Sequence, residues 1–216
     1  MKQNLTELVF ILDRSGSMSG LEKDTIGGFN SMVSRQKNES GEAFVTTVLF
    51  DNNYELLHDR RDIRNIKPIT SKEYYVCGST ALLDAIGITI NKIGKTLADI
   101  KEEERPAKVM FVIITDGMEN SSSEFTYGKI KEMIEHQKSM YSWDFIFLGA
   151  NINAIKTAAS FGIDEDKATN FCCDSAGTQL NYKVVSEAVS NFRQGKRVDA
   201  SWKAEIEKDF NNRGKR

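Results

Sequence analysis

Residues 8–19 of the chain read Leu-Val-Phe-Ile-Leu-Asp-Arg-Ser-Gly-Ser-Met-Ser. An apolar run rich in β-forming residues ends abruptly in a polar loop that contains a glycine, and a helical pattern follows. This arrangement predicts a buried strand that leads through the loop into a helix.

The loop places oxygen-bearing side chains at alternate positions, on Asp13, Ser15 and Ser17. In an irregular turn after a strand, alternate side chains can converge on one point. One carboxylate and two hydroxyls are hard ligands, which suit Mg²⁺ or Mn²⁺ better than zinc or copper. The same loop also fits a capped turn, with Asp13 or Ser15 bonding loop amides and Ser17 or Ser19 at the helix N-cap. The loop alone leaves both interpretations open.

The chain has the composition of an ordinary globular domain. It contains 216 residues, 40% hydrophobic and 28% charged, so a full core can form without disulfide or metal staples. The net charge of −2 gives no global attraction to nucleic acid or to an anionic membrane. Only two prolines and no low-complexity tract argue against long linkers, and we therefore expect one main domain.

The first residues lack the apolar core of a signal peptide, because the apolar run that begins at Leu8 is interrupted by Asp13. No stretch is long enough to span a bilayer. We therefore expect a cytoplasmic protein. The three cysteines, Cys77, Cys172 and Cys173, show no Cys-x-x-Cys spacing, and their odd number favours reduced thiols over a disulfide framework.

Apolar runs alternate with helical patterns along the rest of the chain. The patterns predict further strands at 43–50, 54–59, 108–115, 143–148 and 168–171, and helices at 20–37, 80–97, 127–138, 152–161 and 178–193. The polar turn at 51–53 predicts an antiparallel hairpin at one edge. The other connections predict right-handed crossovers. We therefore expect an α/β fold: a Rossmann-like, doubly wound, mostly parallel sheet with one antiparallel edge strand and helices on both faces.

Ligands of such sheets bind beyond the carboxyl ends of the strands, near the point where the strand order switches. The loop with Asp13 follows the first strand, and Asp116 follows the strand at 108–115. The unbroken apolar character of that strand predicts a central position in the sheet. The candidate ligands therefore fall where a site is expected.

Three motifs in this order resemble the von Willebrand factor A domain family, which includes the inserted domains of integrins. They are Asp13-Arg14-Ser15-Gly16-Ser17, Thr80 within Gly78-Ser79-Thr80-Ala81-Leu82, and Asp116 within Ile114-Thr115-Asp116-Gly117. In the family these positions form the metal-ion-dependent adhesion site (MIDAS). The resemblance covers roughly residues 5–193, and it implies a von Willebrand A domain at 1–195 with a charged helical extension at 196–216.

The resemblance implies that Asp13, Ser15, Ser17, Thr80 and Asp116 hold a Mg²⁺ ion, for which Mn²⁺ is a substitute. The hydroxyls would bind as neutral oxygens, while the two carboxylates in the family often act through water or through the hydroxyl ligands. Few direct carboxylates leave the ion electrophilic, and its open position accepts an Asp or Glu carboxylate from a partner protein. Mg²⁺ keeps waters in octahedral oxygen coordination, which fits such an open site.

These residues also have simpler structural interpretations. Thr80 fits a helix N-cap, with Ser79 as a competitor for either role, and Asp116 fits a turn before a glycine. Glu119 and Asp51 are further acids near the site, and we expect them to be charges on its rim rather than ligands.

Other kinds of chemistry have little support. His58 and His136 are the only histidines, and neither has a partner at metal-ligand spacing, which disfavours a zinc site or a Ser-His-Asp triad. The glycine-rich nucleotide-binding motifs are absent. Ser15 beside Asp13 and a metal could accept a phosphoryl group, but the loop has little basic character with which to cradle a phosphate.

The segment 196–216 mixes basic and acidic residues. Trp202, Ile206 and Phe210 recur at i, i+4 and i+8, which gives one helical face an apolar stripe. Such a face packs on the parent domain or, alternatively, docks a partner or another copy of the chain.

The sequence thus predicts a non-enzymatic, Mg²⁺-dependent protein-binding module without a nucleic-acid or membrane partner. Besides a scaffold that keeps the fold while the metal is idle, two alternatives stay open. One is a cytoplasmic subunit that acts with an ATPase or chelatase-type machine, as bacterial members of the family can. The other is a Mg²⁺-dependent phosphotransferase or hydrolase, which would need an exposed general base beside the metal.

Overall fold

The structure is a computed structural model that describes residues 1–213, and it shows an α/β fold. Its strands are β1 (Lys2–Asp13), β2 (Glu42–Phe50), β3 (Tyr54–Asp62), β4 (Pro106–Thr115), β5 (Asp144–Gly149) and β6 (Ala168–Asn170). Its α-helices are α1 (Glu22–Lys37), α2 (Leu82–Ala98), α3 (Tyr127–Tyr141), α4 (Ala154–Ser160), α5 (Ser175–Arg193) and α6 (Ala204–Arg213).

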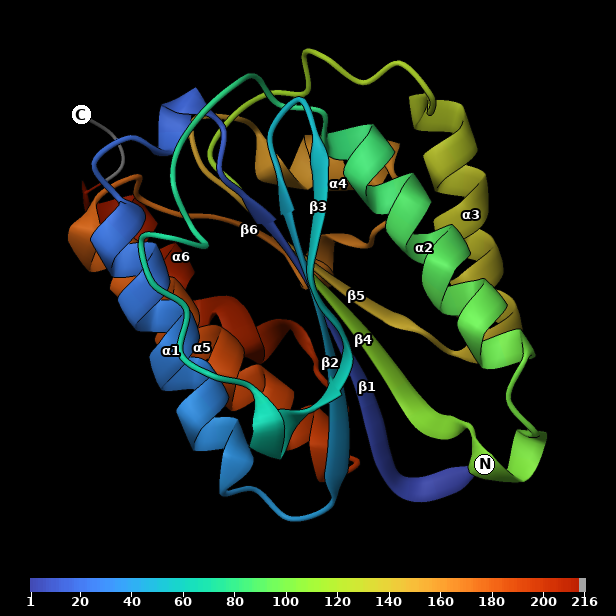
Figure 1. The fold of residues 1–216 in the computed structure, drawn as a ribbon. Coiled ribbons are helices and arrows are strands. Elements are labelled where there is room, and N and C mark those ends of the chain that lie inside the picture. The colour runs from blue at the N-terminus through green and yellow to red at the C-terminus, as the bar shows by residue number, and fades with distance from the viewer. Residues whose placement is uncertain (214–216) are drawn as a thin grey trace.

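Six strands of the described chain form one sheet in the order β3-β2-β1-β4-β5-β6. β3 runs antiparallel to β2 at one edge, and all other neighbouring strands are parallel. The chain moves outward from β1 through β2 to β3 and then crosses to β4 on the other side, so the strand order switches between β1 and β4 (Figure 1). The loops after these two strands therefore open where doubly wound sheets bind ligands.

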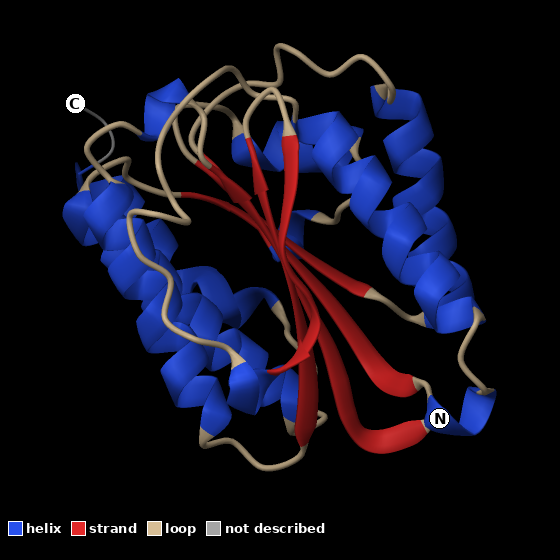
Figure 2. Ribbon diagram, in the orientation of Figure 1, coloured by secondary structure: helices blue, strands red, loops and turns tan. Residues whose placement is uncertain are grey.

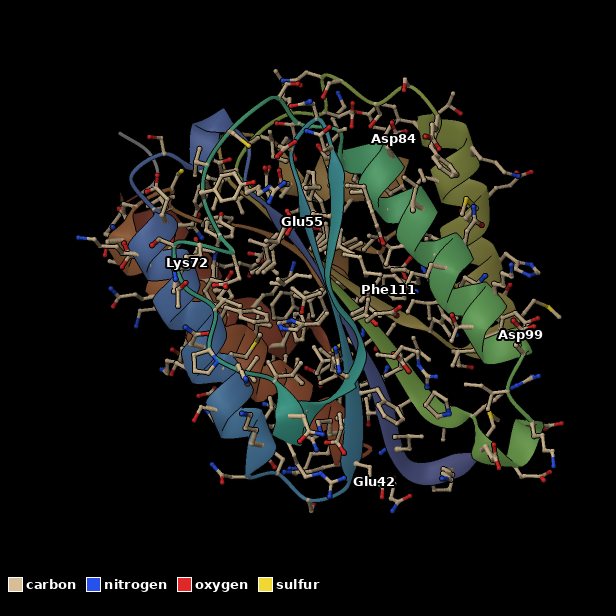
Figure 3. The ribbon with its side chains drawn as sticks, in the orientation of Figure 1. Glu42, Glu55, Lys72, Asp84, Asp99 and Phe111 are labelled. Atoms are coloured by element: carbon tan, nitrogen blue, oxygen red, sulfur yellow. The ribbon has the colours of Figure 1, made fainter. Side chains whose placement is uncertain are left out.

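Helices cover both faces of the twisted sheet, and Figure 2 shows the two helical layers on either side of the strands. α1, α5 and α6 lie on one face, and α2, α3 and α4 lie on the other (Figure 1). Side chains alternate along β1, because Phe10 points into the first layer while Val9 and Ile11 point into the second. Phe111 of β4, labelled in Figure 3, is fully buried in the second layer. The central strands are thus buried on both faces, as their unbroken apolar runs predict.

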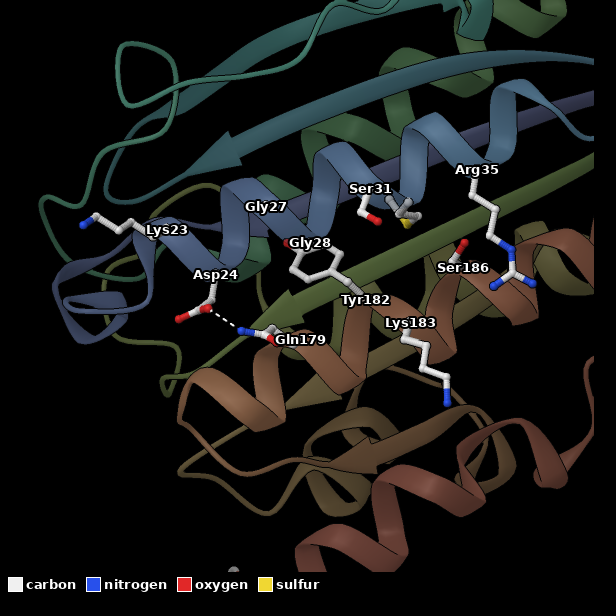
Figure 4. Close-up of a pocket in the computed structure, with 11 residues that line it drawn as sticks. Lys23, Asp24, Gly27, Gly28, Ser31, Arg35, Gln179, Tyr182, Lys183 and Ser186 are labelled. Carbon is white, nitrogen blue, oxygen red and sulfur yellow. Dashed lines mark hydrogen bonds between the residues drawn. The ribbon is translucent and has the colours of Figure 1, made fainter.

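α1 and α5 approach closely because α1 has a glycine at their contact. A Cβ atom on Gly28 would lie 2.3 Å from Cδ2 of Tyr182, so only glycine leaves room for the buried tyrosine ring. Figure 4 shows the ring beside Gly28 in the groove between the two helices. This contact fixes the position of α1 and of the loop that leads into it.

The predicted fold class is confirmed, and each predicted strand and helix is present with shifted ends. β1 begins at Lys2, ahead of the apolar run, because Lys2 pairs with Pro106 of β4. β3 continues to Asp62, three residues beyond the predicted strand at 54–59. In the described part of the chain, no helix has both the length and the apolar character that crossing a membrane requires.

The apolar stripe of the C-terminal segment packs on the domain. Ile206 is buried in the core beneath α5, and Trp202 Nε1 donates to the carbonyl of Asp166 at 2.8 Å. Lys203 Nζ donates to the carbonyl of Ala168 at 2.9 Å and so ties the segment to β6. Residues 214–216 of the predicted extension lie outside the described residues, and a domain boundary at residue 195 stays a prediction.

Candidate metal centre

The predicted ligands lie in three loops at the carboxyl end of the sheet, the upper edge in Figure 1. Asp13 is the last residue of β1, the segment after it carries Ser15 and Ser17, the loop after β4 carries Asp116, and the loop before α2 carries Thr80. β1 and β4 are paired neighbours, so the residues that leave them lie side by side. The fold therefore brings these side chains to one edge of the molecule.

Asp13 forms the floor of the site. It is 1% exposed, and its carboxylate accepts hydrogen bonds from Ser15 N at 2.7 Å and from Thr115 Oγ1 at 2.5 Å. Its backbone is also held, because the Tyr74 hydroxyl donates to the Asp13 carbonyl at 2.6 Å. Burial raises the pKa of Asp13 to about 6, although the hydrogen bonds from Thr115 and Ser15 oppose the shift. The carboxylate is fixed in place and lacks a compensating positive charge among these contacts.

The hydroxyls of Ser15 and Ser17 lie next to each other, with their Oγ atoms 3.1 Å apart. Ser17 Oγ donates to Asp116 Oδ1 at 2.5 Å. Burial raises the pKa of Asp116, and the hydrogen bonds from Ser17 and Cys173 oppose this shift. In octahedral Mg²⁺ sites with bonds of about 2.1 Å, adjacent ligand oxygens are about 3 Å apart. The two serine hydroxyls are therefore spaced as neighbouring ligands of one ion.

Thr80 reaches the same point from the loop before α2. A Cβ atom on Gly117 would lie 3.1 Å from Ser17 Oγ and 3.4 Å from Thr80 Oγ1, so both hydroxyls lie against this glycine. The backbone of Thr80 is held by Asn120, since Thr80 N donates to Asn120 Oδ1 at 2.9 Å and Asn120 N donates to the Thr80 carbonyl at 3.0 Å. The backbone contacts of Thr80 thus place its hydroxyl beside Gly117, the same glycine that the Ser17 hydroxyl faces.

The helix-capping interpretations do not hold. The N-cap position of α2 is occupied by Ala81, one residue after Thr80, and it makes no side-chain cap bond. The N-cap position of α1 is occupied by Leu21, so neither Ser17 nor Ser19 caps that helix. The Ser17 hydroxyl, one of the proposed caps, instead donates to Asp116.

The donor set fits a hard divalent ion. Hydroxyl and carboxylate oxygens are the ligands that Mg²⁺ and Mn²⁺ prefer. Within residues 1–213, no group of three or more His, Cys, Asp or Glu side chains is placed to hold a metal. A metal at this edge would therefore depend on the hydroxyls of Ser15, Ser17 and Thr80. The carboxylates of Asp13 and Asp116, which accept hydrogen bonds from Ser15 and Ser17, would supply the negative charge.

From the sequence, Asp51 is expected on the rim of the site, and this expectation is wrong. Asp51 is part of a buried ion pair. It is fully buried, Arg14 Nε donates to its Oδ2 at 2.9 Å, and the Cys77 thiol donates to the same atom at 3.0 Å. The Arg14 guanidinium also bonds Glu55, which Figure 3 labels on β3. Arg14 needs these carboxylates because only 4% of it is exposed.

Glu119, expected as a charge on the rim, has a structural role. Its carboxylate accepts hydrogen bonds from the backbone nitrogens of Leu83, Ser121 and Ser122 at 2.7–2.9 Å. It therefore ties the loop after β4 to the N-terminus of α2. Asp84, labelled at the start of α2 in Figure 3, holds the next part of this loop through the amides of residues 123–125.

Two supporting residues are missed by the sequence reasoning. Thr115 holds the Asp13 carboxylate through a hydrogen bond. The sequence feature that could have identified it is a hydroxyl residue at the end of β4, the strand that pairs with β1. Cys173, expected from the sequence only to be a reduced thiol, has its Sγ 3.6 Å from Asp116 Oδ2. Its position depends on how the loop after β6 folds back toward β4, which no local pattern predicts.

Comparison with family models and with curated proteins finds no match. Comparison with solved structures finds the same fold in proximal thread matrix protein 1 from the mussel byssus, in a form described as having a zinc occupied MIDAS motif. The TM-score is 0.58 at 13% identity, over 86% of this chain and 46% of that one. A von Willebrand factor type A structure from Catenulispora acidiphila matches with a TM-score of 0.57 at 15% identity, over 86% of this chain and 42% of that one.

The ArnB paralog VWA2 from Sulfolobus acidocaldarius matches with a TM-score of 0.50 at 19% identity, over 86% of this chain and 45% of that one. The chain thus spans less than half the length of each of these three proteins. At these identities the likeness shows the fold, which is that of von Willebrand factor A domains.

Proposed function

We propose that this chain is a metal-dependent protein-binding module, in which a Mg²⁺ ion held at the carboxyl edge of the sheet accepts an Asp or Glu carboxylate from a partner protein. The observation that carries the proposal is the convergence of the Ser15, Ser17 and Thr80 hydroxyls beside two carboxylates that no basic side chain contacts in the described hydrogen-bond network. The zinc occupied MIDAS motif described for the mussel protein supports the binding of a divalent ion by this fold.

Each residue has a distinct role in this proposal. Ser15, Ser17 and Thr80 bind the ion as neutral oxygens, while Asp13 orients Ser15 through its amide and Asp116 orients Ser17 through its hydroxyl. Bound there, the ion supplies Lewis acidity and an exchangeable coordination position. Because the direct ligands are neutral, a carboxylate from outside the chain is a favourable additional ligand.

We also propose that the module is not an enzyme. An enzyme of the phosphotransferase or hydrolase type needs a free general base near the reacting atoms. The Asp13 carboxylate is taken up by hydrogen bonds from Ser15 and Thr115. His58 lies on β3 with its ring stacked on Phe29, and burial lowers its pKa. A cytoplasmic location and an intracellular partner stay parts of the proposal.

Calorimetric titration of Mn²⁺ into wild type, Thr80→Val and Ser79→Ala tests the metal site. Thr80→Val removes one hydroxyl and keeps the shape of the side chain, so we expect Mn²⁺ affinity to fall at least about tenfold. Ser79→Ala is the matched control, and its Mn²⁺ affinity should equal that of wild type. Unchanged affinity in Thr80→Val, or no Mn²⁺ binding by wild type at millimolar metal, would contradict the proposal.

Repeating the wild-type titration in excess acetate tests the carboxylate step. Once the Mn²⁺ bound by free acetate is accounted for, acetate should tighten Mn²⁺ binding, because it occupies the open coordination position. If acetate leaves the affinity unchanged, the site holds metal without accepting an outside carboxylate.

A further inference from the structure

A groove of about 640 Å³ lies directly beside the candidate metal centre, and we call it the side groove. Its apolar wall comes from four segments that are far apart in the sequence. They are the loops after β4, β5 and β6 and the helix α6, which contribute Met118, Ile152, Phe171, Cys173 and Phe210.

The side groove shares its inner boundary with the candidate metal centre. Cys173 Sγ lies 3.6 Å from Asp116 Oδ2, and Asn151 Nδ2 donates to the Asp116 carbonyl at 3.2 Å. Met118 follows Gly117, the glycine against which the Ser17 and Thr80 hydroxyls lie. The side groove is therefore within reach of a chain that places a carboxylate at the metal.

α6 gives the groove its outer wall. The first two residues of its apolar stripe, Trp202 and Ile206, pack on the core, whereas the third, Phe210, is half-buried and lines the groove. The end of the helix is fastened to the loop after β6, because Arg213 Nη1 donates to Asp174 Oδ2 at 2.6 Å. Phe210 is thus held at the metal-bearing edge rather than buried in the core.

The chemistry of the groove favours an uncharged side chain. Its two charged lining residues, Arg213 and Asp174, form an ion pair with each other. Met118 is 72% exposed at the rim, and an exposed methionine beside an apolar wall is a common feature of adaptable binding surfaces. Burying an aliphatic side chain here would cover Met118 and the half-exposed face of Phe210.

We propose that the side groove is a specificity subsite that receives an apolar side chain of the partner, on the residue directly before or after the one whose carboxylate binds the metal. This inference rests on the proposed function. Consecutive Cα atoms are 3.8 Å apart, and alternate residues of an extended chain are about 6.5 Å apart, so a neighbour of the metal-bound acid reaches the groove. The partner is therefore a protein with an extended segment in which Asp or Glu adjoins a Leu-, Met- or Phe-like residue.

The test measures binding of short acetylated and amidated peptides to wild type at saturating Mn²⁺ by calorimetry. Asp-Leu is compared with Asp-Gly and Asp-Lys, and Leu-Asp with Gly-Asp, so that both chain directions are covered. In at least one direction the Leu peptide should bind about tenfold more tightly than its Gly counterpart, which corresponds to burial of one aliphatic side chain. Asp-Lys should bind more weakly than Asp-Leu, because its charge gains nothing from the apolar wall.

The variants Met118→Ser and Phe210→Ser should reduce the Leu-to-Gly affinity ratio to near one. Met118 is exposed, so its replacement keeps the test valid even if Phe210→Ser folds poorly. Tyr141→Ala, which removes a 58% exposed aromatic ring from the end of α3, is the control and should keep the wild-type ratio.

Equal binding of the Leu and Gly peptides by wild type would overturn the subsite, as would a ratio that neither Met118→Ser nor Phe210→Ser changes. In both cases carboxylate binding at the metal would stand. Failure of every peptide and of acetate to bind would instead overturn the proposed function itself. The two failures are therefore distinguishable.

Discussion

Asp13 and Arg14 are neighbours in the chain, yet their side chains enter two polar clusters of opposite character at the same edge of the sheet. The hydroxyl cluster consists of Asp13, Ser15, Ser17, Thr80 and Asp116. The arginine cluster consists of Arg14, Asp51, Glu55 and Cys77. In the hydroxyl cluster the donors to the carboxylates are an amide, hydroxyls and a thiol, all neutral. In the arginine cluster one guanidinium bonds two carboxylates.

The acid–base properties of the two clusters differ accordingly. Burial raises the pKa of Asp13 to about 6, because neutral hydrogen bonds do not fully compensate the buried charge. Burial would also raise the pKa of Asp51, but hydrogen bonds from Cys77, Asn53 and Arg14 outweigh it and lower the pKa. The comparison teaches that a carboxylate near a candidate site is a ligand candidate only if the chain has not already supplied its counter-charge.

Replacing Arg14 gives the largest expected effect. Arg14→Met leaves Asp51 buried without its positive partner, so the free energy of unfolding should fall by about 3 kcal/mol, measured by urea denaturation. Arg64→Met is the matched control: its pair with Asp62 is exposed, and the change should be within about 0.5 kcal/mol. A stability loss as small as that of the control would show that the arginine cluster is not a structural unit.

Replacing Asp13 should reduce metal affinity without reducing the stability of the metal-free protein. Asp13→Asn removes the charge and keeps the size, so Mn²⁺ affinity measured by calorimetry should fall about 100-fold. Because folding raises the pKa of Asp13, its ionised form is disfavoured in the metal-free fold. At pH 8 and without metal, Asp13→Asn should therefore be at least as stable as wild type. Asp51→Asn should lose stability and keep Mn²⁺ affinity. If Asp51→Asn instead lost Mn²⁺ affinity and Asp13→Asn lost stability, the distinction between the two clusters would be wrong.

The pH dependence of metal affinity gives a smaller effect. A carboxyl group with a pKa of about 6 is about 90% ionised at pH 7 and about 10% at pH 5, so Mn²⁺ affinity should fall about tenfold between these values. The stability of the metal-free protein changes with pH in the opposite direction to the metal affinity. The contribution of Asp13 to stability is present below its ordinary pKa of 3.8 and is lost as the pH rises through about 6. An affinity that is constant from pH 7 to pH 5 would contradict the assigned role of Asp13.

The fold could be predicted from the sequence because its signals are local. The apolar run at residues 8–12, the hairpin turn at 51–53 and the helical patterns each identify one element, and the order of elements limits the topology. Asp13, Ser15, Ser17 and Asp116 could be selected because they stand at or just after strand ends, whereas Thr80 could be selected only from the resemblance to a family motif. The roles of Asp51 and Glu119 could not, because each depends on partners more than 30 residues away, Arg14 for the first and Leu83 for the second.

The side groove is likewise beyond local patterns. The spacing of Trp202, Ile206 and Phe210 predicts an apolar helical face, but it does not separate the two residues that pack on the core from the one that lines the groove. That distinction depends on how α6 lies against the loop after β6, to which the ion pair between Arg213 and Asp174 joins it.

The most direct measurement is an anomalous difference map from crystals of the wild-type protein soaked in MnCl₂. The account predicts one manganese peak bonded to the hydroxyls of Ser15, Ser17 and Thr80, with the carboxylates of Asp13 and Asp116 next to it. No peak at this position in crystals with millimolar Mn²⁺, or a peak at the Asp51 and Glu55 carboxylates instead, would contradict it.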